Sequence, residues 1–504
     1  MPTLKKQLEA LRNTLSTNLI ERDVAIRLAF LSVLAGEHFL LIGQPGTAKS
    51  ILARRLHLAF RDGQYFERLL TRFSVPEELF GPLSIKALEN DRYERITQGY
   101  LPTASLAFID EIFKANSAIL NALLTVLNER EFDNGDQRVK IPLLAVIGAS
   151  NELPEEAELA ALYDRFLCRY QVQGVSAERF IDLLQLPETA ITPPDDDLRL
   201  DPDNIISIQQ QAEKLALPDN VLQLLEALHG FLQQQNISVS DRRWRKAVKL
   251  LKVSAYTNGQ DTVSIWDCWL LQHCLWEQPK QRQAIADWYV AHVGIGSGFN
   301  HHRLEKLVKT WELTLKTDTH SQTQQRNAND EPLYQDDQGQ TTSLKQQTIL
   351  GQRNGEALYL APPDVKDGQG YSKQELRQQF FDDTYEQCHI NGQWVHLNQY
   401  VQQQANRLVQ VQEHTPLMAP ISHPESFINS RVQDITLLHD ELLTLYAALE
   451  QQHASLDHNL GEHLWVMSSF MENAANSLAE SMQAAKSLTK RLHTVLVSYQ
   501  TLAS

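Results

Sequence analysis

The chain has little cysteine and no long apolar run, and each of these shortages excludes a class of protein. Four cysteines are present among 504 residues, and their spacing matches neither a disulfide framework nor a metal-binding pattern. No apolar stretch approaches the roughly 20 residues that a membrane-spanning helix needs. The first residues lack the basic, apolar and cleavage regions of a secretory signal. We therefore expect a cytoplasmic protein without a membrane span.

The sequence has fewer basic than acidic side chains. The sequence has 62 acidic and 46 basic side chains, a formal net charge of −16. A chain this acidic disfavours the phosphate backbone of a nucleic acid as its main partner, so no nucleic acid is expected. Its length suits about two to four domains.

A loop of mostly small residues lies between a predicted buried strand, 38–42, and a predicted helix, 51–60. Strand, loop, Lys-Ser and helix in this order form a phosphate cradle. Loop N–H groups and the helix N-terminus would face the phosphates, with Lys49 against the β- and γ-phosphates and Ser50 on Mg²⁺. Ala48 stands where a glycine usually precedes the lysine, and its small side chain should preserve the cradle. The expected nucleotide-binding residues are Gly43, Gln44, Pro45, Gly46, Thr47, Ala48, Lys49, Ser50 and Ile51.

An acidic pair, Asp110 and Glu111, ends a second predicted buried strand, 106–109. The carboxyl edge of an open α/β sheet is where ligands bind. We expect Asp110 to support Mg²⁺ through a coordinated water, and Glu111 to orient or deprotonate the attacking water. The alternative is that both carboxylates cap the helix that begins near Lys114.

Further candidates follow a third apolar run, 143–147. Asn151 lies at the tip of this predicted strand, where an amide can hold the attacking water or sense the γ-phosphate, although asparagine is also an ordinary turn residue. Arg165, and either Arg242 or Arg243, can bring positive charge to the transition state, including from another subunit. Each arginine could instead form a surface ion pair.

These motifs, in this order and spacing, resemble those of AAA+ ATPases of the MoxR family. The resemblance rests on Gly-x-Pro-Gly-x-Ala-Lys-Ser at 43–50, Phe-Ile-Asp-Glu at 108–111, Ala-Ser-Asn at 149–151 and Asp-Arg-Phe at 164–166. It is strengthened by the entry and exit of a helix-2 insertion at 71–83 and 99–102, the lead into a hairpin at 128–135, and a second-sensor segment at 240–246 similar to that of the RavA branch (regulatory ATPase variant A). The resemblance covers about residues 5–300.

The resemblance implies a role for each candidate. Glu111 would serve hydrolysis, Asn151 would be the first sensor, and Arg165 would be an arginine finger that reaches into a neighbouring subunit's site. Arg242 would be the second sensor, with the adjacent Arg243 as an alternative. ATP and Mg²⁺ would be the cofactors, and the assembly would be a homo-oligomer, usually a hexamer. Similar proteins pair with a von Willebrand factor A domain protein, and those of the RavA branch also bind lysine decarboxylase.

The predicted function is ATP hydrolysis in a ring that remodels or chaperones partner proteins. One alternative is a nucleotide-gated adaptor, which binds partners with little turnover. Another is the ATPase subunit of a chelatase or of a nucleic-acid motor, because these share the insertion and the hairpin.

The predicted fold is an α/β P-loop AAA+ core at 1–192 with a small all-α lid at 193–298. Apolar residues at three-four spacing predict a helical bundle made of 299–320 and 425–504. A β-rich interaction module at 321–424 interrupts this bundle. Within it, residues 320–345 are too polar to build a core and suggest a linker or loop, whereas 388–397 should form a hairpin because Asn-Gly suits a tight turn.

Overall fold

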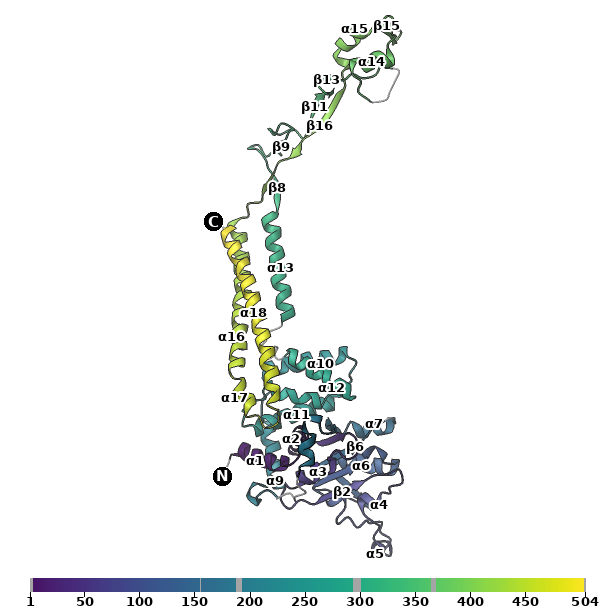
Figure 1. Ribbon diagram of the computed structural model, residues 1–504, viewed down its shortest axis with the longest axis vertical. Coiled ribbons are helices and arrows are strands. Elements are labelled where there is room, and N and C mark those ends of the chain that lie inside the picture. The colour runs from purple at the N-terminus through teal and green to yellow at the C-terminus, as the bar shows by residue number, and fades with distance from the viewer. Residues whose placement is uncertain (1–2, 155, 187–192, 293–300, 364–368, 503–504) are drawn as a thin grey trace. The chain divides into compact units, whose positions relative to one another are not determined.

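The computed structural model describes residues 3–154, 156–186, 193–292, 301–363 and 369–502. The chain divides into two compact units, one made of residues 1–306 and 437–491, the other of 307–436 and 492–504. The first unit contains the sheet and the lid, and the second contains the β-rich module (Figure 1).

A five-stranded parallel sheet forms the centre of the first unit, in the order β2-β3-β6-β1-β7. Its strands are β1 (His38–Ile42), β2 (Tyr65–Leu69), β3 (Leu106–Asp110), β6 (Ala145–Ser150) and β7 (Phe166–Gln171). Strands β1 and β6 are buried along their whole length, as expected for parallel strands covered on both faces. The central position of β1 brings the loop that follows it to the middle of the carboxyl edge.

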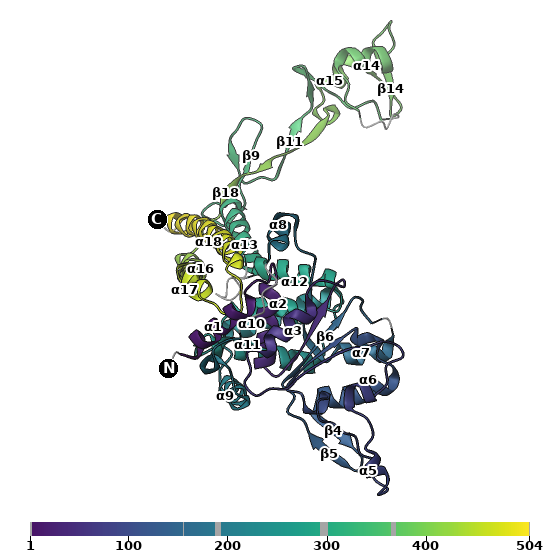
Figure 2. The same ribbon diagram turned by 60° about the horizontal axis from the view of Figure 1, so that its bottom comes forward.

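Helices cover both faces of this sheet (Figure 2). Helices α2 (Asp23–Leu34) and α3 (Lys49–His57) lie on one face, and α6 (Ser117–Glu129) and α7 (Ala157–Tyr163) lie on the other. Right-handed crossovers explain this division, because the chain moves from β1 to the edge strand β2 in one direction and returns through β3 and β6 in the other. Helix α1 (Leu4–Ser16) packs against α2.

The predicted insertion lies between β2 and β3 and contains the short helices α4 (Glu77–Phe80) and α5 (Ile85–Leu88). The predicted hairpin is formed by β4 (Glu131–Asn134) and β5 (Gln137–Lys140). The rings of Phe80 and Phe132 stack with centroids 5.2 Å apart, so the insertion packs on the hairpin. Gly81 has a φ of 92°, and a Cβ there would lie 1.9 Å from the carbonyl oxygen of Ile96, so only glycine fits.

A small helical lid follows the sheet, after the short helix α8 (Phe180–Leu184). It consists of α9 (Pro202–Glu213), α10 (Asp219–Gln234), α11 (Asp241–Thr257), the 3₁₀ segment Asp267–His273 and α12 (Pro279–His292). The residues after α17 (Leu456–Gly461) pack on this lid: His463 Nε2 lies 3.3 Å from Asp267 Oδ1, and Trp465 Nε1 donates to Thr257 Oγ1 at 2.8 Å. The lid core thus includes a segment that is nearly 200 residues away in sequence.

Three long helices contribute residues to both units: α13 (His301–His320), α16 (Glu425–Ala454) and α18 (Ser469–Leu502). Within the second unit the hydroxyl of Tyr499 donates to Asp318 Oδ2 at 2.7 Å, and the guanidinium of Arg431 lies 5.6 Å from the centre of the Trp311 ring. None of the helices in the described ranges is both long and apolar enough to cross a membrane.

The expectation that residues 320–345 form a linker is wrong, because they pair with the returning chain as a narrow ribbon. Strand β8 (Gln322–Gln324) pairs with β18 (Met418–Pro420), and β9 (Tyr334–Gln335) pairs with β10 (Thr341–Thr342) and β17 (Thr415–Pro416). Strand β11 (Gln346–Leu350) pairs with β16 (Val409–Glu413), and β12 (Gln352–Arg353) with β13 (Glu356–Ala357). Backbone hydrogen bonds, rather than a core, hold such a polar ribbon together.

The ribbon leads to a small head with its own core. The head contains α14 (Lys373–Phe380), β14 (Gln387–Ile390), β15 (Gln393–His396) and α15 (Leu397–Gln402). Strands β14 and β15 confirm the predicted hairpin, and its turn residues Asn391 and Gly392 both have positive φ, 52° and 84°. The core of the head consists of Tyr359, Tyr371, Leu376, Phe381, Ile390, Leu397 and Tyr400.

Candidate nucleotide site

The phosphate loop connects β1 to α3, and α3 begins at Lys49. Gly46 and Ala48 both have left-handed backbone conformations, with φ of 80° and 65°. Ala48 therefore adopts the conformation that the usual glycine would supply, at a cost in strain.

A cavity of about 280 Å³ opens at this loop. Its lining residues are Pro45, Gly46, Thr47, Ala48, Lys49, Ser50, Ile51, Asp110, Glu111 and Asn151. The other two residues expected to bind nucleotide, Gly43 and Gln44, lie behind it and present their carbonyl oxygens to Lys49. A Cβ on Gly43 would lie 2.2 Å from the carbonyl oxygen of Val172, so the loop passes close to the end of β7.

Lys49 occupies the centre of the site. Its Nζ donates to the carbonyl oxygens of Gly43 at 2.6 Å and Gln44 at 3.0 Å, and to Asn151 Oδ1 at 3.3 Å. Burial lowers the pKa of Lys49, and the charges of Asp110 and Glu111 oppose that shift. The ammonium is satisfied by neutral oxygens, which a phosphate would replace with a stronger, charged acceptor.

Asp110 and Glu111 lie side by side at the carboxyl edge of β3. Asp110 Oδ1 accepts the backbone N–H of Glu111 at 3.0 Å. Glu111 has a φ of 53°, a left-handed conformation that is costly for a residue with a side chain and is typical of functional sites. Its Oε1 accepts a hydrogen bond from Asn151 Nδ2, and its Oε2 lies 3.3 Å from Lys114 Nζ.

The alternative role of the acidic pair, as a helix cap, does not fit these contacts. Helix α6 begins at Ser117, and its N-cap is Asn116, whose Oδ1 accepts the backbone N–H of Ile119 at 3.1 Å. Glu111 precedes only a three-residue 3₁₀ turn and makes no side-chain cap bond there. The carboxylates therefore do not cap α6, and both residues line the cavity.

The residues present suit a magnesium nucleotide. Ser50 and Asp110 line the same cavity, and hydroxyl and carboxylate oxygens are ligands that Mg²⁺ accepts, commonly with bound waters. The described residues contain no group of three or more His, Cys, Asp or Glu side chains that could hold a metal ion by themselves. Mg²⁺ would thus be held mainly together with the phosphates of the nucleotide.

The two candidate arginines lie at the opposite, amino edge of the sheet. Arg242 donates to Asn128 Oδ1 at 2.8 Å, near the end of α6. That end of α6 is at the beginning of β1, because His38 Nε2 lies 2.9 Å from the Leu127 carbonyl oxygen. Arg165 directly precedes β7, whose first residue pairs with His38. The strand rises about 3.3 Å per residue, so the two edges are about 13 Å apart, and neither arginine lines the phosphate-loop cavity.

Arg243 has a different position from its neighbour. Its side chain is buried and donates to the carbonyl oxygens of Phe166, Leu167 and Cys274 at 3.0–3.2 Å, and its Nε lies 3.3 Å from Asp164 Oδ1. These contacts join the lid to β7. The sequence carried a signal for this role, because Arg243 continues the three-four spacing of the buried α11 residues Ala247, Leu250, Leu251 and Ser254.

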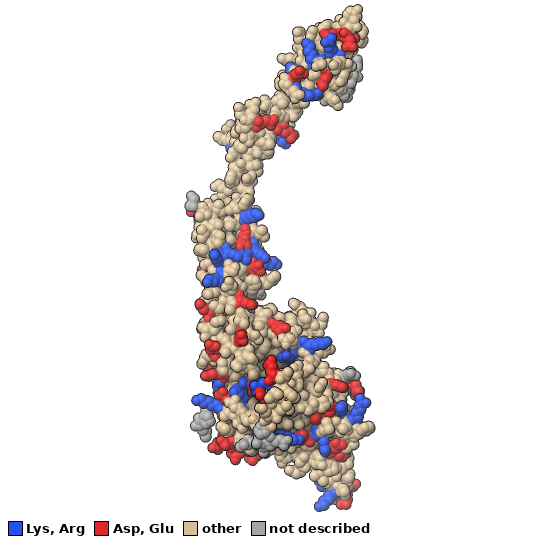
Figure 3. Space-filling model, in the orientation of Figure 1, with Lys and Arg blue, Asp and Glu red and all other residues tan. Residues whose placement is uncertain are grey.

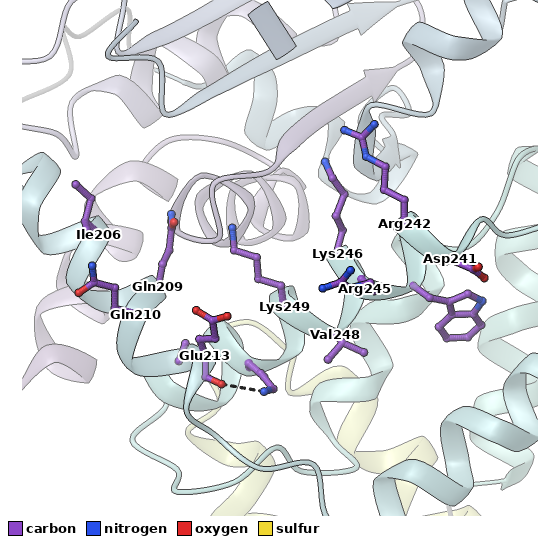
Figure 4. A pocket seen from close by; sticks show the side chains of 13 residues that line it. Ile206, Gln209, Gln210, Glu213, Asp241, Arg242, Arg245, Lys246, Val248 and Lys249 are labelled. Carbon is purple, nitrogen blue, oxygen red and sulfur yellow. Dashed lines mark hydrogen bonds between the residues drawn. The ribbon is translucent and has the colours of Figure 1, made fainter. Parts of the chain in front are cut away.

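Sequence reasoning missed a second, basic cavity beside Arg242. It measures about 1060 Å³ and lies between α9 and α11 (Figure 4). Lys246 Nζ lies 2.6 Å from Glu37 Oε2, whereas Arg245 has no hydrogen-bond or ion-pair partner among the described residues. The three-four spacing of the α11 basic residues could have revealed this face: Arg242, Arg245, Lys246, Lys249 and Lys252.

Family models match both the sheet-containing part of the chain and the lid. Residues 6–210 match a family model described as the MoxR domain in the MoxR-vWA-beta-propeller ternary systems, and residues 220–289 match an AAA lid domain. Two uncharacterized proteins of Methanocaldococcus jannaschii are each 45% identical to this chain over 285 and 281 residues, which is 55% and 54% of this chain and 72% of each relative. The chain belongs to the MoxR family of AAA+ ATPases. A crystal structure of a Cytophaga hutchinsonii protein, 16% identical, covers 56% of this chain and 93% of its own length with a TM-score of 0.47.

Proposed function

We propose that this MoxR-family protein hydrolyses ATP in a ring, a hexamer by resemblance to its family. The cycle of ATP binding and hydrolysis would remodel or chaperone partner proteins. The observation that carries the proposal is the convergence of Lys49, Asp110, Glu111 and Asn151 on one cavity at the carboxyl edge of the sheet. Lys49 would hold the β- and γ-phosphates, and Mg²⁺ near Ser50 and Asp110 would neutralise phosphate charge. Glu111 would take the proton of the attacking water while Asn151 contacts the γ-phosphate.

A ring is supported by the position of the arginines. Arg165 and Arg242 lie at the edge opposite to their own phosphate loop, about 13 Å away along β1. A single chain therefore offers no arginine to its own γ-phosphate from this pair. In a ring, the amino edge of one subunit would face the nucleotide of the next, with Arg165 as the finger and Arg242 as the second sensor. Arg243 is already bound to backbone carbonyls and is not available for this role.

The partner proposed is a von Willebrand factor A domain protein, as the description of the matched family suggests. The β-rich module, with its own core in the head, would hold a further protein. The RavA-like subtype and a lysine decarboxylase partner stay predictions. A nucleic-acid motor is disfavoured by the net charge of −16, and acidic and basic side chains are interspersed on the displayed face of the first unit (Figure 3).

The first test is steady-state ATP turnover, measured beside native mass spectrometry with and without ATP. The wild type should turn over and assemble, Glu111→Gln should bind ATP without hydrolysing it, and Lys49→Ala should fail to bind it. Assembly with negligible wild-type turnover would instead favour the nucleotide-gated adaptor. Stimulation by DNA or RNA at moderate salt would favour the nucleic-acid motor.

A mixing experiment tests action between subunits. Arg165→Ala should bind ATP normally and hydrolyse it slowly, because only transition-state charge is lost. Mixed with Lys49→Ala, it should regain activity, since some interfaces then combine an intact phosphate loop with an intact finger. No regain in rings shown by mass to be mixed would refute action from the neighbouring subunit.

A further inference from the structure

The carboxylate of Glu111 is restrained from two sides. Asn151 Nδ2 donates to Oε1, and Lys114 Nζ lies 3.3 Å from Oε2. The Glu111 side chain is 13% exposed and the Lys114 side chain is 50% exposed. The pair thus joins a mostly buried carboxylate that lines the cavity to a half-exposed ammonium, and both oxygens of the proposed base have a donor.

The two restraints respond differently to a nucleotide. Asn151 Oδ1 accepts from Lys49 Nζ at 3.3 Å, and both residues line the cavity, so a γ-phosphate there would draw both toward itself. Lys114 does not line that cavity. It lies at the end of the 3₁₀ turn Ile112–Lys114, whose backbone is closed by the Lys114 N–H donating to the Glu111 carbonyl oxygen at 2.8 Å. A bound nucleotide would therefore weaken the hydrogen bond between Asn151 and Glu111. It would leave the ion pair between Lys114 and Glu111 in place.

We propose that Lys114 is a positioning residue that holds Glu111 in a resting geometry and keeps basal hydrolysis slow. The inference rests on the proposed ATPase function. In the hydrolytic step the water oxygen bonds to the γ-phosphorus, the bond from phosphorus to the oxygen of ADP breaks, and the water proton passes to Glu111. An ammonium on Oε2 occupies an oxygen that would otherwise be free to receive the proton. Because Lys114 is half exposed, the pair is weak enough to open during each turnover.

The test is a comparison of kcat and KM for ATP among variants of the full chain. Lys114→Met removes the charge and keeps the length of the side chain, and it should raise kcat by about two- to fivefold, the effect of opening an exposed ion pair. KM should not change, because Lys114 makes no contact in the phosphate loop. Lys114→Arg should keep the wild-type rate, and Lys114→Gln is a second neutral variant.

Two controls separate this effect from general loss of charge and from contamination. Lys140→Met removes one exposed lysine from β5 of the same unit and should leave kcat unchanged. Glu111→Gln combined with Lys114→Met should be inactive, because the released group is the base itself. Assembly by native mass spectrometry should be equal in all variants.

The possible failures can be told apart. In the first case, wild-type turnover depends on Glu111, but kcat is equal or lower in both Lys114→Met and Lys114→Gln. That result would overturn the role of Lys114 and leave the ATPase function supported. Equal turnover in wild type and Glu111→Gln would overturn the ATPase function itself. Bound ATP that neither wild type nor Lys114→Met hydrolyses would reject both.

Discussion

Arg242 and Arg243 are adjacent in sequence, and the structure predicts opposite consequences for the same substitution at each. Arg243→Met should destabilise the first unit, whereas Arg242→Met should leave its stability unchanged and lower ATP turnover. Arg243 is 5% exposed and donates to three backbone carbonyls as well as contacting Asp164. Among the residues that the structure describes, the hydrogen-bond partner of Arg242 is the neutral side-chain amide of Asn128.

The magnitude follows from what Arg243→Met leaves behind. The carbonyl oxygens of Phe166, Leu167 and Cys274 lose their charged donor between β7 and the lid. Hydrogen bonds to charged groups contribute about 1.5–3 kcal/mol each, and removal of one partner from a buried charged network costs about 3–5 kcal/mol. Methionine fills part of the volume, so we expect a loss of about 3–5 kcal/mol. For a unit made of residues 1–306 and 437–491, that corresponds to roughly 4–7 °C in Tm, because the entropy of unfolding grows with chain length.

The assay is thermal unfolding followed by circular dichroism, with ATP turnover measured on the same preparations. Arg242→Met is the matched control, because it removes the same group one residue away, and its Tm should stay within about 2 °C of wild type. If Arg243→Met lowers Tm by less than about 2 °C, the argument that this guanidinium holds the lid to the sheet is refuted. A large decrease for Arg242→Met would show that the two roles are not separated.

Three further predictions concern stability. Ala48→Gly should raise the free energy of unfolding in urea by about 1 kcal/mol, because it relieves a left-handed alanine. Ala53→Gly inside α3 should lower it by a similar amount. The same change in the free energy of unfolding for both variants would argue against strain at Ala48. Burial lowers the pKa of His273 to about 3, so the unfolded state, with a pKa near 6.5, binds the proton more readily. About 2 kcal/mol of stability is therefore lost as the pH falls from 7 to 5. In urea unfolding, His273→Asn should make the midpoint depend less on pH. Gly81→Ala should disorder the insertion, detected as faster proteolysis, because its Cβ meets the Ile96 carbonyl oxygen; wild-type cleavage rates would contradict this.

Much of the candidate nucleotide site could be predicted because its parts are local in sequence. The phosphate loop is defined by one strand, one loop and one helix within about 20 residues, and Asp110 and Glu111 directly end a buried strand. Parallel strands place such ends at one edge of the sheet, so periodicity alone brings Lys49, Glu111 and Asn151 together. Residue chemistry then suggests the reaction.

Other features could not be predicted because they depend on which distant segments meet. The polar ribbon at 320–345 has no apolar pattern, and its strands β8 and β9 pair with the distant strands β18 and β17 at 415–420. The hydrogen bond from Asn151 to Glu111 joins residues 40 positions apart, so it too depends on the assembled sheet.

By itself, the sequence determined the family, the phosphate loop and the acidic pair, since each is encoded by residues a few positions apart. Only the tertiary structure shows the contacts of Arg242 and Arg243, although the three-four spacing on α11 already favours burial of Arg243. The pattern Asp-Arg-Arg-Trp at 241–244 offers two equivalent guanidinium groups. The packing of α11 against β7 buries Arg243 among carbonyl oxygens and leaves Arg242 at the amino edge of the sheet. Burial is a property of the assembled fold, so chemically identical neighbours acquire different contacts only when the helix is packed.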